Sequence, residues 1–150
     1  MGLRWQIDER MSRVFWDTNL FIYLFEGYGN LSERVISLRH AMLARGDQLL
    51  TSALTLGEVL VKPVQQGEEE LARKYEDAIA GAALLLPFDA KAARIYATLR
   101  CDRSLRAPDA IQLACAAGAG VDLFITSDAR LHAKRVERIQ FIVPLERAPL

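Results

Sequence analysis

Apolar residues follow two alternating patterns along the chain. Short, continuous apolar runs predict strands at residues 14–16, 49–51, 84–86, 123–126 and 141–143. The longer segments between them carry apolar residues three and four positions apart, which predicts helices. Strands that are apolar throughout are typical of a parallel sheet covered on both faces. The order of the segments therefore predicts an α/β fold, a three-layer α/β/α sandwich with a central parallel sheet of about five strands.

Turn and capping residues mark the ends of the predicted helices. Gly46 is predicted to stop the second helix, Pro63 to end the third, and Pro108 stands where a later helix begins. The predicted helices cover residues 20–25, 31–46, 52–63, 68–80, 92–99 and a segment from 108, with a short basic helix after the fourth strand. In a parallel α/β sheet the ligand site lies beyond the carboxyl ends of the strands. Candidate chemistry is therefore sought directly after each strand.

The composition is that of an ordinary globular protein. The chain has 150 residues, of which 51% are hydrophobic and 25% are charged. Its 19 Lys and Arg residues balance its 19 Asp and Glu residues. A formal net charge of zero excludes a broadly basic nucleic-acid binder, but it leaves room for a local basic patch.

We expect one cytoplasmic domain. Met11 stands just before the first strand, so residues 1–12 are predicted to be an N-terminal extension and residues 13–150 a single domain. The N-terminus lacks the apolar core of a signal peptide, and no apolar run approaches the roughly 20 residues that span a bilayer. Cys101 and Cys115 are expected to be buried thiols of a reducing compartment.

Four acidic residues follow strands or open helices. Asp17 and Asp128 come directly after the first and fourth strands, Glu58 lies a few residues past the second, and Asp109 opens a helix. Each one also has an ordinary structural explanation. Asp17 and Asp128 suit helix N-caps, Glu58 fits a capping box with Thr55, and an acid in the position of Asp109 is favoured by the helix dipole.

The conjunction of the four acids is more informative than any one of them. In a parallel sheet these positions can converge on one edge. Two carboxylates about 4 Å apart repel by roughly 4 kcal/mol at an effective dielectric constant near 20, so a cluster of four needs protons or a cation. Oxygen ligands without His or Cys suit a hard metal ion, Mg²⁺ or Mn²⁺.

These residues stand in an order that resembles a known family. The chain resembles a PIN-domain ribonuclease in four successive segments. They are Val-Phe-Trp-Asp17-Thr18-Asn19, then Glu58 in a helix, then Pro108-Asp109-Ala110-Ile111, and finally Ile-Thr126-Ser127-Asp128. The compact size is similar to that of the VapC-like toxins of toxin–antitoxin pairs. The resemblance covers about residues 13–145 and implies the PIN-like form of the α/β/α sandwich. Ser127 departs from it, since Asn or Arg is frequent at that position.

The resemblance implies a role for each residue of the motif. Asp17, Glu58, Asp109 and Asp128 would form the catalytic, metal-binding site of an Mg²⁺- or Mn²⁺-dependent endoribonuclease. Thr18 or Asn19 would hold Asp17 in place, and Thr126 or Ser127 would contribute a hydroxyl near the metal or its water. The resemblance also implies RNA as substrate, a cognate antitoxin and a homodimer.

Basic residues lie close to these acids in the sequence. Arg100, Arg103 and Arg106 precede Asp109 and are candidates for binding the RNA backbone, and a second basic group follows Asp128 at residues 134, 135 and 138. A solvated charged surface would look the same in the sequence.

Other functions remain open. An aspartyl-nucleophile phosphatase would place a second Asp two residues after Asp17, where this chain has Asn19, and no receiver-domain acidic pair or late Lys can be placed. An RNA- or protein-binding module without nuclease activity, and a PIN nuclease that is not a toxin, are the alternatives to the toxin hypothesis.

Overall fold

A parallel five-stranded sheet forms the centre of the protein in a computed structural model, which describes residues 11–150. The expected extension at residues 1–10 lies outside the described residues. The strands are β1 (Arg13–Trp16), β2 (Gln48–Ser52), β3 (Leu84–Leu86), β4 (Val121–Ile125) and β5 (Ile139–Val143). Their order across the sheet is β3-β2-β1-β4-β5, and every neighbouring pair is parallel. The predicted sheet is confirmed.

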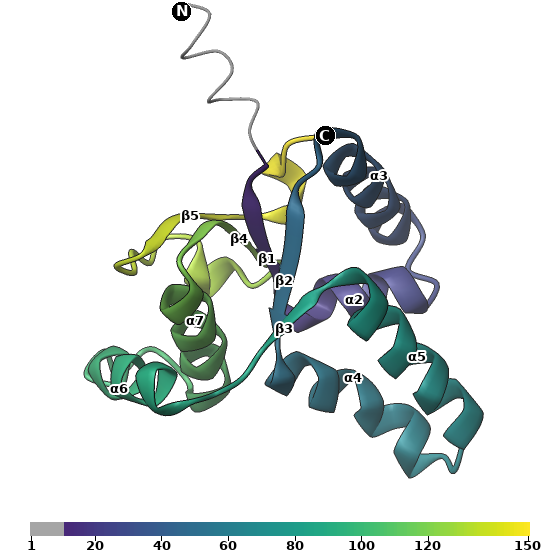
Figure 1. Cartoon of the computed structure of the whole chain (residues 1–150), viewed down its shortest axis with the longest axis horizontal. Coiled ribbons are helices and arrows are strands. Elements are labelled where there is room, and N and C mark those ends of the chain that lie inside the picture. The colour runs from purple at the N-terminus through teal and green to yellow at the C-terminus, as the bar shows by residue number, and fades with distance from the viewer. Residues whose placement is uncertain (1–10) are drawn as a thin grey trace, which may run out of the picture.

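Helices cover both faces of this sheet, which completes the predicted three layers (Figure 1). They are α2 (Thr18–Phe25), α3 (Asn30–Arg45), α4 (Ala53–Gln65), α5 (Glu69–Ala82), α6 (Ala90–Leu99) and α7 (Ala107–Ala119), with short 3-10 helices η1 (Ala129–Leu131) and η2 (Leu145–Arg147). With the sheet seen nearly edge on, α6 and α7 lie on one side and α2 to α5 on the other (Figure 1). No helix within residues 11–150 combines the length and apolar character needed to cross a membrane.

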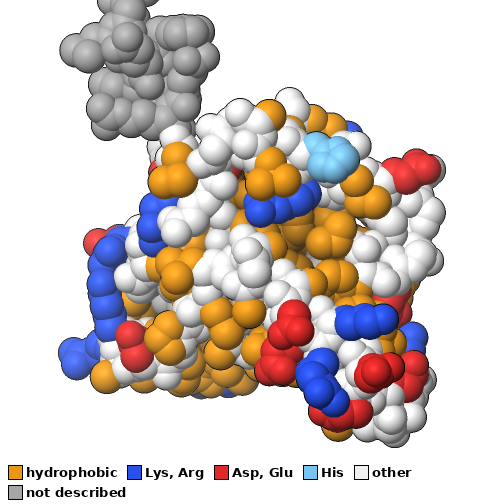
Figure 2. Space-filling model, turned by 45° about the vertical axis from the view of Figure 1, so that its right-hand side comes forward, with side chains coloured by type: hydrophobic (Ala, Val, Ile, Leu, Met, Phe, Trp, Pro, Cys, Tyr) orange, Lys and Arg blue, Asp and Glu red, His pale blue; other side chains and the backbone are white. Residues whose placement is uncertain are grey.

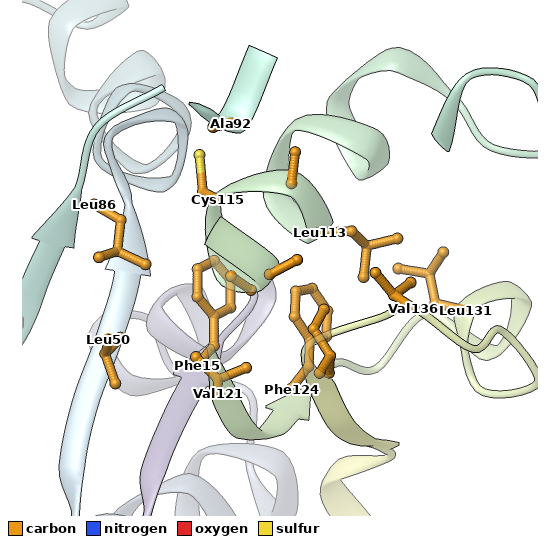
Figure 3. Packing of buried hydrophobic residues seen from close by; sticks show 14 of the residues in the cluster. Phe15, Leu50, Leu86, Ala92, Leu113, Cys115, Val121, Phe124, Leu131 and Val136 are labelled. Atoms are coloured by element: carbon orange, nitrogen blue, oxygen red, sulfur yellow. The ribbon is translucent and has the colours of Figure 1, made fainter. Parts of the chain in front are cut away.

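Alternate residues of β1 serve the two faces of the sheet. Phe15 points toward α7 and stacks on Phe124 of β4, with 4.9 Å between the ring centroids (Figure 3). Val14 and Trp16 point to the opposite face and pack with residues of α2 and α3. All these side chains are essentially inaccessible to solvent. Both faces of the strand are buried from Val14 to Trp16, which explains why this part of its sequence is apolar.

Helix α7 packs tightly on its side of the sheet. Its inward face is made of small and medium residues, and the helix lies over the rings of Phe15 and Phe124 (Figure 3). Small side chains let the helix backbone approach the strands closely. This packing fixes the N-terminus of α7, where Asp109 lies.

Two local expectations need correction. Pro63 does not end its helix, because α4 continues to Gln65 with Pro63 in its last turn. Proline lacks the backbone N–H that would donate to the carbonyl four residues earlier, and the helix ends two residues after it. Cys101 is exposed in the turn after α6, whereas Cys115 is buried as expected. Gly46 caps α3 in the left-handed conformation (φ 77°), as predicted.

Candidate active site

One pocket of about 250 Å³ lies at the carboxyl edge of the sheet, and all four predicted acids line it. The acids come from four different parts of the chain, and the neighbouring lining is polar. Its residues are Asp17, Thr18, Asn19, Ile22, Glu58, Pro108, Asp109, Gln112 and Asp128. The structure therefore brings together the residues that the sequence predicted would converge.

Strand pairing explains why the first and last acids meet. β1 and β4 are adjacent, and Trp16 pairs with Ile125 at their carboxyl ends. The chain then turns into α2 on one strand and toward η1 on the other, which leaves Asp17 and Asp128 at the same edge. Each of them also caps the helix that follows it, so the same carboxylate serves as a helix N-cap and as a lining residue of the pocket.

Asp17 is the most deeply buried of the four carboxylates, with 9% of its surface exposed. Its Oδ2 accepts a hydrogen bond from the hydroxyl of Thr126 at 2.7 Å, and its Oδ1 accepts one from the backbone N–H of Thr18 at 2.8 Å. Burial raises the pKa of Asp17, and the charges of Asp109 and Glu58 raise it as well, against the lowering effect of the two hydrogen bonds. An ionised Asp17 is therefore held firmly but lacks a compensating positive charge.

Glu58 is held by a hydroxyl that reaches it from α2. The hydroxyl of Thr18 donates to Glu58 Oε1 at 2.6 Å, so Thr18 contacts two of the four acids. The capping-box alternative for Glu58 is wrong, because the N-cap of α4 is Ser52, whose hydroxyl accepts from the N–H of Thr55. Glu58 is thus free to face the pocket.

A buried hydrogen-bond network lies beneath this pair, and the sequence analysis did not find it. Gln112 on α7 is 2% exposed. Its side-chain nitrogen donates to the hydroxyls of Thr18 at 3.0 Å and Thr55 at 2.8 Å, and its oxygen accepts from Ser52 at 2.5 Å. Gln112 follows Asp109 by three residues, so its place on the same helix face was the signal available in the sequence.

Asp109 and Asp128 share one arginine. Arg130, on η1, makes a two-pronged ion pair with Asp128 at 2.9 and 2.6 Å and lies 3.8 Å from Asp109. Its hydrogen bond lowers the pKa of Asp128. Burial raises the pKa of Asp109, and the charge of Asp128 raises it further. The sequence analysis predicted a basic helix here but not the direction of this side chain.

The remaining motif residues divide between the floor and the rim of the site. The Thr126 hydroxyl, expected near the metal or its water, is buried and donates to Asp17. Asn19 donates to the hydroxyl of Ser127 at 3.2 Å, and Tyr23 contacts the same hydroxyl at 3.2 Å. Thr18 and Thr126 therefore hold Asp17, whereas Asn19 lines the pocket and Ser127 contacts Asn19.

Of the three arginines proposed to bind RNA, Arg106 lies nearest the acids. It is exposed at the N-cap of α7, and its charge lowers the pKa of both Asp109 and Asp128. Arg100 donates to the hydroxyl of Tyr96 and covers that ring at 5.8 Å. Arg103 is exposed in the turn between α6 and α7.

The second basic group lines a different cavity, along β5. This cavity has a volume of about 560 Å³ and is bordered by residues 132–142. Lys134 is also tied to Asp102 through an ion pair of 2.8 Å.

The donor set of the acidic pocket suits a hard cation. It offers carboxylate and hydroxyl oxygens and no His or Cys, which is the chemistry of Mg²⁺ and Mn²⁺ sites. Asp17 and Asp109 have raised pKa values, so a cation would relieve an unfavourable concentration of negative charge. Across residues 11–150, no three acidic, His or Cys side chains stand close enough together to form a finished metal cage. The chemistry of these donors therefore fits such an ion.

The fold and the pocket define a class: an α/β protein with an acidic site at the carboxyl edge of a parallel sheet. A sequence model of the PIN domain family matches residues 14–137, which include all four acids. The chain belongs to the PIN domain family. A comparison with curated protein sequences gives no significant match.

Solved structures with the same fold come from toxin–antitoxin complexes. VapBC2 from Rickettsia felis, bound to a promoter DNA fragment, is 16% identical, with a TM-score of 0.68 over 88% of this chain and 98% of the other. A toxin–antitoxin complex from Klebsiella pneumoniae is 24% identical, with a TM-score of 0.66 over 88% and 97%. DNA-bound VapBC from Salmonella typhimurium is 16% identical, with a TM-score of 0.70 over 90% and 99%. At these identities the similarity establishes the fold.

Proposed function

We propose that this protein is a metal-dependent endoribonuclease and the toxin of a toxin–antitoxin pair. The observation that carries the proposal is the pocket at the sheet edge, where four carboxylates from four parts of the chain meet. Arg130 pairs with only two of these acids, and the mutual repulsion of clustered carboxylates destabilises a fold. The arrangement is explained if the acids bind a cation and the cation acts on a phosphodiester.

Asp17, Glu58, Asp109 and Asp128 would hold Mg²⁺ or Mn²⁺. When bound, such an ion lowers the pKa of a water molecule and neutralises charge that builds up on the phosphate. The protein's own contribution is to fix the positions of the carboxylates through hydrogen bonds. Thr126 and Thr18 fix both oxygens of Asp17, and Thr18 fixes Glu58 at the same time.

The negative pocket also needs positive charge nearby to admit an RNA backbone. Arg106 is the N-cap residue of α7, and its charge acts on Asp109 and Asp128. Arg100 and Arg103 continue this basic surface along the turn that precedes α7. We propose that these three arginines contact phosphates next to the scissile bond.

The toxin assignment draws on the structural neighbours, which are VapBC and toxin–antitoxin complexes. We propose that a cognate antitoxin binds this chain, that the chain forms a homodimer, and that both act in the cytoplasm. Helix α3 offers apolar surface for such contacts, because Leu31, Ile36 and Leu43 are 41%, 42% and 58% exposed. Figure 2 shows a broad band of hydrophobic side chains on one face, bordered by charged ones.

A cleavage assay on purified protein tests the enzyme proposal. The full-length protein should cut single-stranded RNA with Mg²⁺ or Mn²⁺ and should stop when EDTA is added. Asp17→Asn should keep the fold, checked by circular dichroism, and lose cleavage. Asp77→Asn on α5 removes a carboxylate outside the pocket and is the matched control. A fully active Asp17→Asn protein would contradict the proposal, and RNA binding without cleavage would favour the binding-module alternative.

A further inference from the structure

Arg130 forms ion pairs with two of the four carboxylates that line the acidic pocket, Asp128 and Asp109. Its guanidinium pairs with both oxygens of Asp128, through Nε at 2.9 Å and Nη2 at 2.6 Å, and Nη2 lies 3.8 Å from Asp109. The backbone N–H of Arg130 also donates to Asp128 Oδ1, at 3.0 Å. One arginine therefore bridges two of the four carboxylates.

This ion pair has the geometry of a strong one. A planar guanidinium that meets a carboxylate through two parallel hydrogen bonds forms a stronger contact than a single-point pair. The carboxylates of Asp128 and Asp109 are only 18% and 20% exposed, so solvent screens them less than it screens a surface pair. Arg130 donates to both oxygens of Asp128, so a cation that binds this carboxylate competes with the guanidinium for the same negative charge.

Arg130 is also able to leave. Its side chain is 51% exposed, and it stands on a 3-10 helix of three residues. Its outward rotation breaks the ion pairs but leaves the backbone cap on Asp128 in place. The side chain can thus exchange between the carboxylates and solvent without unfolding η1.

We propose that Arg130 is an internal counter-ion that competes with the divalent cation for Asp128 and Asp109. It neutralises the pocket when no metal is bound and lowers the affinity of the pocket for the metal, so that cation binding is coupled to release of the arginine. The inference rests on the proposed function, because it takes the acidic pocket to be the cation site.

The test is a Mn²⁺ titration of the full-length protein without RNA, followed by the electron paramagnetic resonance of free Mn²⁺. Arg130→Gln should bind Mn²⁺ about 3- to 10-fold more tightly than the wild type, as expected when one competing ion pair is removed. Arg130→Lys, which keeps the charge but loses the two-pronged contact, should lie between them. Arg135→Gln is the matched control, because it removes the same charge from an exposed residue of the same segment.

A double-mutant cycle locates the effect. In an Asp128→Asn background, Arg130→Gln should change the Mn²⁺ affinity much less than it does in the wild type, because the carboxylate for which the two cations compete is gone. Equal effects in both backgrounds would contradict competition at Asp128.

The remaining outcomes separate the two proposals. If the wild type binds Mn²⁺ and Arg130→Gln binds it equally well, the counter-ion inference is wrong and the proposed function stands. The inference also fails if Arg130→Gln raises KM for RNA at unchanged Mn²⁺ affinity, because Arg130 then contacts the substrate. If neither the wild type nor any Arg130 variant binds Mn²⁺, the metal-dependent function itself is wrong, and the inference fails with it.

Discussion

The buried amide of Gln112 provides the sharpest test of how the site is supported. Gln112→Leu keeps the approximate size of the side chain and removes three hydrogen bonds at once. The Ser52 hydroxyl loses its acceptor, and the hydroxyls of Thr18 and Thr55 each lose a donor. A buried donor left unpaired costs about 1–3 kcal/mol, and each other lost bond costs about 0.5–1.5 kcal/mol. The sum, reduced by the apolar gain of leucine, is roughly 2–4 kcal/mol.

Urea unfolding followed by circular dichroism measures this loss directly. The free energy of unfolding of Gln112→Leu should fall by that amount. The protein should stay folded at 25 °C, since the free energy of unfolding of native domains is about 5–15 kcal/mol. Gln140→Leu makes the same substitution at an exposed position of β5 and should stay within about 0.5 kcal/mol of the wild type. A Gln112→Leu protein as stable as the Gln140→Leu control would refute the network argument.

Three further predictions concern charge, thiols and chain length. Hydrogen bonds from Lys134 and Ser104 lower the pKa of Asp102 to about 2. The Asp102–Lys134 pair therefore stabilises the fold fully at a pH above 3.8, the ordinary pKa of Asp, and this stabilisation is lost as the pH falls through 2. An NMR titration should show this pKa, and Lys134→Met should return it toward 3.8. Burial raises the pKa of Cys115 to about 11, whereas Cys101 is exposed. Ellman's reagent at pH 8 should therefore modify Cys101 and leave Cys115 of the folded chain unmodified. Fast reaction of both thiols would contradict the burial of Cys115. We propose that residues 13–150 form the domain, so a chain that begins at Met11 should melt at the full-length temperature, and its failure to fold would refute this.

Much of the architecture was predictable because buried positions are apolar and their spacing along the chain differs between strands and helices. Strands covered on both faces are apolar where they are covered, and this rule located Val14–Trp16 of β1 and Leu123–Ile125 of β4. It missed the first residues of β4, which include Asp122. The carboxyl ends of parallel strands meet at one edge of the sheet, so Asp17 and Asp128 could be expected there, although each is also an ordinary helix cap. The strand order, which makes β1 and β4 neighbours, was not predicted.

The parts that were missed depend on side-chain directions between distant segments. Nothing local indicates that Gln112 reaches back to Ser52, 60 residues earlier, because the contact exists only when α7 packs on β2 and α4. Arg130 is close to Asp128 in sequence, but an arginine on an exposed 3-10 helix can point to solvent as easily as to a carboxylate. Cys101 was expected to be buried from residue type alone, and its position in a turn decides otherwise.

The central claim is that the four carboxylates at the sheet edge cleave RNA. Sequencing of RNA 5′ ends after parallel induction of the wild type and Asp17→Asn in cells tests it most directly. We predict new, recurrent cleavage ends with the wild type that are absent with Asp17→Asn at equal protein levels. The same ends in both samples, or no new ends with the wild type, would contradict the assignment of this pocket as a ribonuclease site.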